Sequence, residues 1–225
     1  MRCVTFDNRG TGSSVHTDRA VSIPQMAADA RAVLDALGID RAHVVGHSMG
    51  GSIACELALQ SPSRVESLAL LCTFAQGAQA TAMTPALLWS GLRSRLGTRA
   101  MRRAAFLELI MPPSALAGAD RQVLARALEP VFGRDLADQP AIAMAQLGAM
   151  RRYDRRKELG GLGPIRTLVV SAQHDRIARP RYGRELALAI PGSKYVEWPN
   201  AAHGLPIHRA TEINDLLAAF WTAGG

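Results

Sequence analysis

The sequence predicts an α/β fold, in which a mostly parallel sheet is flanked by helices and the middle of the chain forms a helical insertion. Short apolar runs rich in β-branched residues alternate with amphipathic segments of helical spacing. The run from Val65 to Phe74 is apolar almost throughout, as is typical of a parallel strand buried on both faces. The chain has 225 residues, of which 48% are hydrophobic, so it can hold one such domain with an insertion but not two domains.

The first part of the sheet and its helices is expected in residues 1–74. Arg2–Phe6 is predicted to be a strand. A helix should follow from about Pro24 to Leu37, because proline suits a first helical turn and Gly38 suits the position just after the last turn. The segment His43–Val45 is predicted to be the next strand, and it leads into a helix that ends near Gln60.

Residues 75–160 differ in character from the rest of the chain. They are rich in Ala, Leu, Met and Arg, lack strand-like runs and are interrupted by prolines, which predicts a helical insertion. The alternation of strands and helices returns in residues 161–225, the second part of the predicted core. Its expected elements are strand Ile165–Ser171, helix Pro180–Ile190, strand Tyr195–Trp198 and a helix over about Arg209–Thr222.

Positive charge is concentrated in the predicted insertion. The whole chain carries a formal charge of +7, and residues 79–160 hold 13 basic and 7 acidic side chains. Such a surface can attract anions or nucleic acid, although a solvated helix face is the favoured interpretation. Aromatic residues make up 5% of the chain and do not alternate with the arginines, so no nucleic-acid partner is expected. The basic residues form two groups: Arg93, Arg95, Arg99, Arg102 and Arg103, and then Arg151, Arg152, Arg155, Arg156 and Lys157.

The composition also bears on location and cofactors. The N-terminal residues contain no apolar run of signal-peptide length, and no apolar stretch is long enough to cross a membrane. A cytoplasmic protein without a membrane partner is therefore expected. The three cysteines, Cys3, Cys55 and Cys72, have no metal-binding spacing and are expected to be reduced thiols. We expect no metal and no cofactor.

Residues 42–51 read Ala-His-Val-Val-Gly-His-Ser-Met-Gly-Gly and contain the pattern Gly-x-Ser-x-Gly between a strand and a helix. This is the pattern of a nucleophile elbow, in which a sharp turn exposes the hydroxyl of Ser48. Gly46 and Gly50 are expected at their positions because the strand and helix backbones pass close to each other there. The alternative is an ordinary glycine-rich turn.

A serine nucleophile needs a base and a carboxylate that orients the base. Of the six histidines, only His203 lies in a loop of small residues just beyond the last predicted strand. Asp175 follows strand 165–171, although a surface aspartate is the alternative interpretation. Ligands of open parallel sheets bind outside the carboxyl ends of the strands, so Ser48, Asp175 and His203 are predicted to form a catalytic triad there.

With these residues the chain resembles the α/β-hydrolase fold superfamily, in its esterase, lactonase and C–C hydrolase branches with a helical cap. The order Ser48, Asp175, His203 matches the order of nucleophile, acid and base in that superfamily. Residues 7–14, Asp-Asn-Arg-Gly-Thr-Gly-Ser-Ser, resemble a loop that many members carry after the fourth strand. By the same resemblance residues 75–160 are the cap. A serine at the elbow separates the chain from relatives that use aspartate, such as haloalkane dehalogenases and epoxide hydrolases.

The chain departs from the family pattern at its beginning. Members carry three strands and a helix before the segment that corresponds to Arg2–Phe6, and one of those strands lies between the fourth and fifth strands of the sheet. Two outcomes are open: the strands at residues 2–6 and 43–45 pair directly, or the sequence begins at an internal methionine of a longer protein, which is the favoured hypothesis. The missing part also supplies one of the two oxyanion-hole amides, which leaves the backbone N–H of Met49 as the expected donor.

The resemblance implies a serine hydrolase that cleaves a small carboxylic ester or lactone through an acyl-enzyme. Two alternatives stay open: a C–C bond hydrolase or acyltransferase that uses the same three residues, and a non-catalytic truncated fragment. The arginines at 151, 152, 155 and 156 suggest, weakly, a substrate that bears a carboxylate. Some apolar residues of the insertion are candidates for an acyl pocket, although most are expected to form its packing core: Met83, Trp89, Leu92, Phe106, Met111, Phe132, Met144 and Met150.

Overall fold

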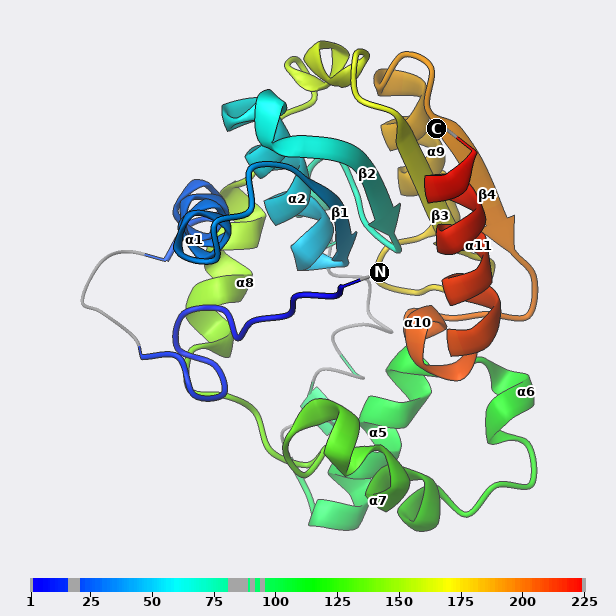
Figure 1. Cartoon of the computed structure of the whole chain (residues 1–225). Helices are drawn as coiled ribbons and strands as arrows, with labels where there is room; N and C mark the ends of the chain where they lie inside the picture. The colour runs from blue at the N-terminus through cyan, green and yellow to red at the C-terminus, as the bar shows by residue number, and fades with distance from the viewer. Residues whose placement is uncertain (1, 16–20, 81–88, 90–91, 94–95, 224–225) are drawn as a thin grey trace.

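The computed structural model describes residues 2–15, 21–80, 89, 92–93 and 96–223. Its sheet has four parallel strands in the order β1-β2-β3-β4, and their carboxyl ends all point toward the helices of the insertion (Figure 1). The strands are β1 (Ala42–His47), β2 (Val65–Leu71), β3 (Thr167–Ala172) and β4 (Lys194–Trp198). The predicted parallel sheet is therefore confirmed.

Helices cover both faces of this sheet. Three of them, α1 (Ile23–Ala36), α2 (Met49–Gln60) and α9 (Pro180–Ala189), pack on one face, and α11 (Ala210–Thr222) packs on the other (Figure 1). Successive side chains of β2 alternate between the two cores: Leu68 and Leu70 face the first group of helices, and Ala69 and Leu71 face α11. Because both faces are covered, the strand is apolar from Leu68 to Leu71, which is the feature that marked it in the sequence.

The ends of α1 follow from local chemistry. The Ser22 hydroxyl accepts a hydrogen bond from the backbone N–H of Gln25 at 3.2 Å, and Pro24 occupies the first turn. After the last turn, Gly38 has a φ of +62°, a left-handed conformation that glycine adopts without strain. The helix predicted over about 24–37 is thus observed with its boundaries shifted by one residue.

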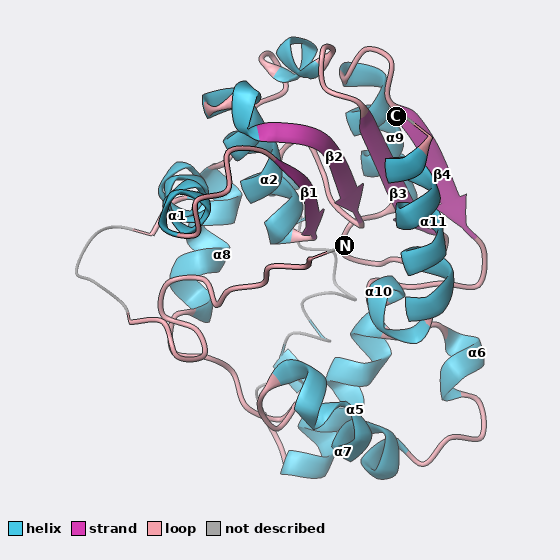
Figure 2. Ribbon diagram, in the orientation of Figure 1, coloured by secondary structure: helices cyan, strands magenta, loops and turns pink. Residues whose placement is uncertain are grey.

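Between β2 and β3, the described residues form helices and loops (Figure 2). Leu107, Leu116 and Leu128 belong to a separate hydrophobic cluster of this region, distinct from the two cores against the sheet. The short helix α10 (Leu205–His208) comes later, after β4, and the sequence did not predict it. The helices of the insertion are α3 (Gly77–Ala80), α5 (Arg99–Ile110), α6 (Pro113–Leu116), α7 (Arg121–Phe132) and α8 (Ala143–Arg152).

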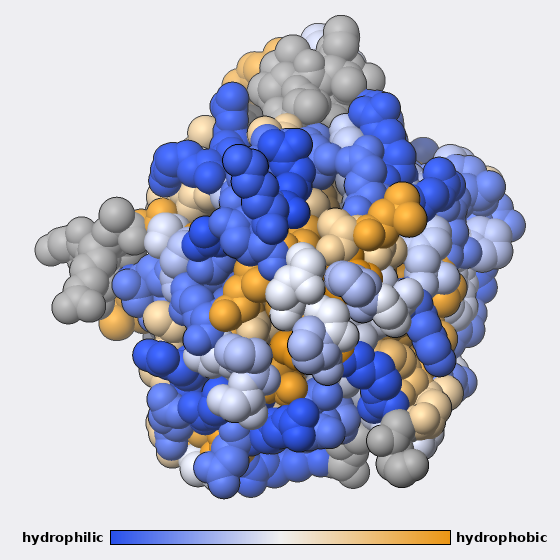
Figure 3. Space-filling model, turned by 90° about the horizontal axis from the view of Figure 1, so that it is seen from above, coloured by the Kyte–Doolittle hydropathy of each residue, from blue (hydrophilic) through white to orange (hydrophobic). Residues whose placement is uncertain are grey.

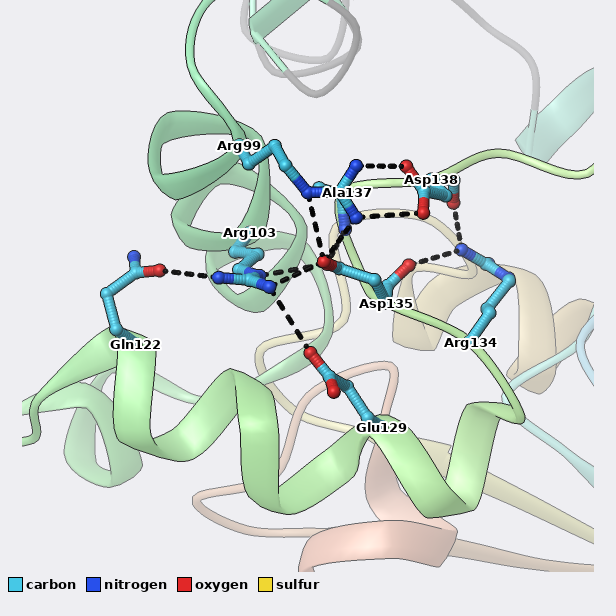
Figure 4. A network of polar contacts seen from close by, with 8 residues as sticks. All are labelled: Arg99, Arg103, Gln122, Glu129, Arg134, Asp135, Ala137 and Asp138. Carbon is cyan, nitrogen blue, oxygen red and sulfur yellow. Dashed lines mark hydrogen bonds and ion pairs between the residues drawn. The ribbon is translucent and has the colours of Figure 1, made fainter.

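Most of the first arginine group is held by carboxylates. Asp135, just after α7, accepts hydrogen bonds from Arg99 and from Arg103, whose Nε lies 2.8 Å away (Figure 4). Arg99 also binds Asp138, and Arg103 approaches Glu129 at 3.4 Å. Figure 4 shows this network joining α5 to α7 and the loop after it. Of the other members, Arg93 pairs with Glu108, and Arg95 lies outside the described residues.

The second arginine group is only partly a solvated face. Arg155 forms two hydrogen bonds, of 2.8 and 2.9 Å, with the carboxylate of Glu56, a residue of α2 that is 1% exposed. Arg156 pairs with Asp154 at 2.7 Å, whereas Arg151 and Arg152 are exposed at the end of α8. Ion pairs within the protein therefore neutralise much of the positive charge of the arginines in residues 79–160.

The strand predicted at Arg2–Phe6 is wrong. These residues are exposed and form an irregular trace, and in the described part of the chain the sheet begins at β1 (Figure 1). A strand forms only where a neighbour satisfies its backbone hydrogen bonds, and no strand among the described residues pairs with residues 2–6. Direct pairing with β1, one of the two expected outcomes, is likewise not observed. The loop of residues 7–14 is held both by contacts within it and by α1. The Asp7 carboxylate accepts a hydrogen bond from the Ser13 N–H at 3.0 Å, and Arg9 binds Asp29 of α1.

The surface seen from the side opposite the insertion is mostly hydrophilic, with small apolar groups between polar side chains (Figure 3). Within the described residues, none of the helices combines the length and apolar character that crossing a bilayer requires.

Candidate active site

Ser48 lies at the turn between β1 and α2, in a backbone conformation with φ 55° and ψ −122°. A non-glycine residue rarely takes a positive φ, and here neighbouring hydrogen bonds impose it. The Ser48 N–H donates to the Leu71 carbonyl at 2.9 Å, and the Ser48 carbonyl accepts from the Thr73 hydroxyl at 2.7 Å. The sharp turn expected of a nucleophile elbow is therefore present.

The glycines around Ser48 differ in how closely they are packed. A Cβ on Gly46 would lie 2.3 Å from the Gly50 carbonyl oxygen, and a Cβ on Gly51 would lie 2.6 Å from the Thr73 side chain. A Cβ on Gly50 would meet nothing within 4 Å. A Cβ therefore has no room at Gly46 or at Gly51, which lies against Thr73 just after β2, whereas it would have room at Gly50.

The structure brings the three predicted residues Ser48, Asp175 and His203 into one hydrogen-bonded chain. His203 Nε2 lies 2.9 Å from Ser48 Oγ, and His203 Nδ1 lies 2.8 Å from Asp175 Oδ2. A carboxylate only accepts, so Nδ1 carries the proton and Nε2 is free to accept from the serine hydroxyl. His203 is 6% exposed and Asp175 is 4% exposed. This is the tautomer and the orientation that a general base needs.

The loops that carry Asp175 and His203 are tied to each other and to the insertion. The Oδ1 atom of Asp175 accepts from the N–H groups of Ile177 and Ala178, both at 2.8 Å, which closes a tight turn after β3. The His174 N–H donates to the Ala201 carbonyl at 2.7 Å, two residues before His203. On the other side, the Gly204 N–H donates to the carbonyl of Ile110, the last residue of α5, at 2.7 Å.

His47 takes part in the site although the sequence did not single it out. Its Nε2 lies 2.7 Å from the backbone carbonyl of His203, and the two imidazole rings are 4.8 Å apart at 47°. Burial, together with the neighbouring His203, lowers the pKa of His47 from 6.5 to about 4. His47 is therefore neutral at pH 7. Its place beside Ser48 was visible in the sequence, but its contact crosses 156 positions along the chain.

Two further groups border the chain of Ser48, His203 and Asp175. Met49 is the first residue of α2, so its N–H has no acceptor within the helix and lies at the positive end of the helix dipole. Cys72 follows β2 with a φ of 47°, and burial and the Asp175 carboxylate raise the pKa of its thiol. All three cysteines are unpaired, with Cys55 and Cys72 buried and Cys3 exposed.

The apolar candidates for an acyl pocket have varied environments. Phe106 and Phe132 stack edge to face at 5.3 Å in the hydrophobic cluster of the insertion, whereas Met111 also lines an open groove beside Asp175. Met150 is buried against the core that includes β2, β3 and α11. Trp89, Leu92 and Met144 are exposed, and Met83 lies outside the described residues.

No group of three or more histidine, cysteine, aspartate or glutamate side chains in the described residues is arranged to hold a metal ion.

Known proteins are similar to this chain in sequence and in fold over nearly its whole length. A family model described as alpha/beta hydrolase fold matches residues 1–210. The protein named Rhodomycin D methylesterase DauP, from Streptomyces sp. strain C5, is 30% identical in an alignment 241 positions long. The alignment covers 96% of this chain and 78% of the relative.

Solved structures agree with the sequence relatives. The enol-lactonase from Burkholderia xenovorans LB400 superimposes with a TM-score of 0.75 and 30% identity, over 96% of this chain and 79% of that one. Rv0554 from Mycobacterium tuberculosis superimposes with a TM-score of 0.81 and 25% identity, over 97% and 78% of the two chains. This chain is an enzyme and belongs to the alpha/beta hydrolase fold family.

Proposed function

We propose that this enzyme is a serine hydrolase that cleaves a small carboxylic ester or lactone through an acyl-enzyme, with Ser48, His203 and Asp175 as its catalytic triad. The observation that carries the proposal is the continuous hydrogen-bonded chain from Ser48 Oγ through both ring nitrogens of His203 to Asp175. An activated serine attacks a carbonyl carbon, so the nucleophile supports an acyl substrate without selecting among acyl classes.

In this mechanism His203 Nε2 removes the hydroxyl proton of Ser48 as Oγ attacks the substrate carbonyl. The positive charge that develops on the imidazole is stabilised by Asp175, whose second oxygen is already held by two backbone N–H groups. The Met49 N–H at the start of α2 stabilises the negative oxygen of the tetrahedral intermediate. His203 then returns the proton to the leaving group, and an activated water releases the acyl group from Ser48.

Residues 75–160 act in this proposal as a cap over the catalytic residues. The hydrogen bond from the Gly204 N–H to Ile110 supports this role, because it joins α5 to the residue next to His203. The names of two relatives, a methylesterase and an enol-lactonase, support an ester or lactone as substrate.

A fluorophosphonate probe, which reacts only with an activated serine, tests the nucleophile. Wild-type protein should be labelled, and the Ser48→Ala variant should not. Ser52→Ala is the matched control, because Ser52 lies one helical turn further along α2 and its hydroxyl has no hydrogen-bond partner among the described residues. Labelling that survives Ser48→Ala, or that is absent from folded wild-type protein, would refute the proposal.

Turnover of p-nitrophenyl esters of graded acyl length, and of a γ-lactone, tests the reaction. Ester or lactone hydrolysis should fall by about 10³-fold or more in His203→Ala and by a similar factor in Asp175→Asn. If the probe labels Ser48 but neither substrate class is hydrolysed, the nucleophile is correct and the proposed substrate class is wrong.

A further inference from the structure

An open groove of about 840 Å³ lies between the insertion and the loop that carries Asp175. Its wall on the insertion side includes Met111, Leu116 and Arg121, and its other wall includes Arg176 and Arg179. Neither Ser48 nor His203 is among the described residues that line it.

Two of the three arginines that line this groove are not neutralised by any described residue. Within the described part of the chain, the guanidinium groups of Arg176 and Arg179 make no hydrogen bond and no ion pair, and Arg121 only approaches Glu108 at 4.0 Å. Glu108 is shared, because Arg93 also pairs with it at 3.4 Å. Elsewhere in the protein, Arg99, Arg103, Arg155 and Arg156 are all bound by carboxylates.

The carboxylate of Asp175 does not cancel this charge, although Asp175 also borders the groove. Its side chain is fully buried, one oxygen binds His203, and the other accepts the N–H groups of Ile177 and Ala178. An anion in the groove would therefore meet the unpaired guanidinium groups of Arg176 and Arg179 on this side, while Glu108, which also lines the groove, is shared between Arg93 and Arg121.

The groove is also preorganised. The turn that Asp175 closes fixes the backbone between Arg176 and Arg179. The Gln173 N–H donates to the carbonyl of Trp198 at the end of β4, and the His174 N–H donates to the carbonyl of Ala201 in the loop that follows. Pro180, the first residue of α9, also lines the groove. Binding to a site on a fixed backbone causes a smaller loss of conformational entropy.

We propose that this groove binds the carboxylate or phosphate group of a small molecule, with Arg176 and Arg179 as its main ligands. Arg121 completes the site from the insertion, and the uncharged part of the molecule lies against Met111 and Leu116. Because Arg176 immediately follows Asp175, a bound anion links the insertion to the loop that holds the proposed catalytic acid. This site is independent of the proposed hydrolytic function, and its test needs no turnover.

Isothermal titration calorimetry of the full chain at low ionic strength tests the site, with inorganic phosphate and succinate as separate probes. At least one probe should bind saturably, with a Kd of about 10 mM or below. The double variant Arg176→Ala/Arg179→Ala should weaken that binding by about tenfold or more, because charge-assisted hydrogen bonds are lost. Binding of one probe alone identifies the anion that the site prefers, and supports the proposal.

The matched control is Arg151→Ala/Arg152→Ala, which removes the same charge from the exposed end of α8. This control and Ser48→Ala should both bind the probe within about twofold of wild type. Equal weakening in the two arginine double variants would show nonspecific attraction and overturn the proposal. Absence of saturable binding by folded wild-type protein, or loss of binding in Ser48→Ala, would overturn it as well.

Discussion

The imidazole of His47 donates a hydrogen bond from Nε2 to the backbone carbonyl of His203 at 2.7 Å. A carbonyl oxygen can only accept, so His47 must carry its proton on Nε2. His47, which precedes the predicted nucleophile Ser48, thereby binds the backbone of the predicted base His203. The two side chains of the elbow turn thus reach the same histidine, Ser48 through the ring of His203 and His47 through its main chain.

The lowered pKa of His47 predicts a stability that depends on pH. In the folded state His47 takes up a proton only near pH 4, whereas an unfolded histidine does so near 6.5. As the pH falls from 6.5 toward 4, the unfolded state binds more protons, so the free energy of unfolding decreases. Urea unfolding at about pH 7 and about pH 5 should show a larger loss for wild type than for His47→Gln, by about 1 kcal/mol. His174→Gln, at an exposed histidine, should behave like wild type; an identical loss in His47→Gln and wild type would contradict the assignment.

The two glycines of the Gly-x-Ser-x-Gly pattern should respond differently to alanine. Gly46→Ala places a methyl group 2.3 Å from the Gly50 carbonyl oxygen, so it should cost about 3 kcal/mol or more in unfolding free energy. Gly50→Ala meets nothing within 4 Å and lies in the first turn of α2, so it should be neutral or stabilise by up to about 1 kcal/mol. Urea denaturation of both variants checks this. Equal destabilisation would show that the elbow is tighter at Gly50 than the structure indicates.

The ion pair between Arg155 and Glu56 should stabilise the fold and have no part in substrate binding. Burial would raise the pKa of Glu56, but hydrogen bonds from Arg155 and Gln60 outweigh it and hold that pKa below its usual value. Arg155→Met leaves a buried carboxylate without its partner, which should cost about 3–5 kcal/mol. The double variant Glu56→Gln/Arg155→Met should recover much of this loss, and Arg156→Met should cost no more than about 1 kcal/mol, because its pair with Asp154 is exposed. Chemical denaturation measures all three; a change in KM for anionic esters without a change in stability would contradict this role.

Asp135 should control how firmly α5 and α7 are joined. It binds both Arg99 and Arg103 and also accepts from the Ala137 N–H at 2.8 Å, contacts that lower its pKa (Figure 4). Asp135→Asn should make residues 96–140 more accessible to limited proteolysis, with cleavage about threefold faster or more. Asp138→Asn, whose side chain is 49% exposed, is the control and should change the rate less. Equal cleavage of wild type and Asp135→Asn would show that other contacts hold the helices together.

The core of the fold could be predicted from local patterns. The apolar run of β2 and the glycine-rich turn before α2 each reflect interactions within a few residues. The strand at residues 2–6 was predicted from the same kind of pattern and is wrong, because a strand also needs a hydrogen-bonded neighbour that composition does not report. For the same reason the close packing of Gly46 within the elbow was predictable, but that of Gly51 against Thr73 was not.

Local patterns along the chain sufficed to predict the order of β1 to β4, the serine at the elbow, and the two loops that offer an acid and a base. The tertiary structure decided how those groups meet: His203 contacts Ser48 and the neighbouring His47 across more than 150 positions of the chain. It also decided which arginines are neutralised, since Arg155 finds its carboxylate 99 positions away on α2, whereas Arg176 and Arg179 face an open groove. Charge and hydrogen-bond partners depend on distances in space, and these are set only when the sheet and its helices pack together.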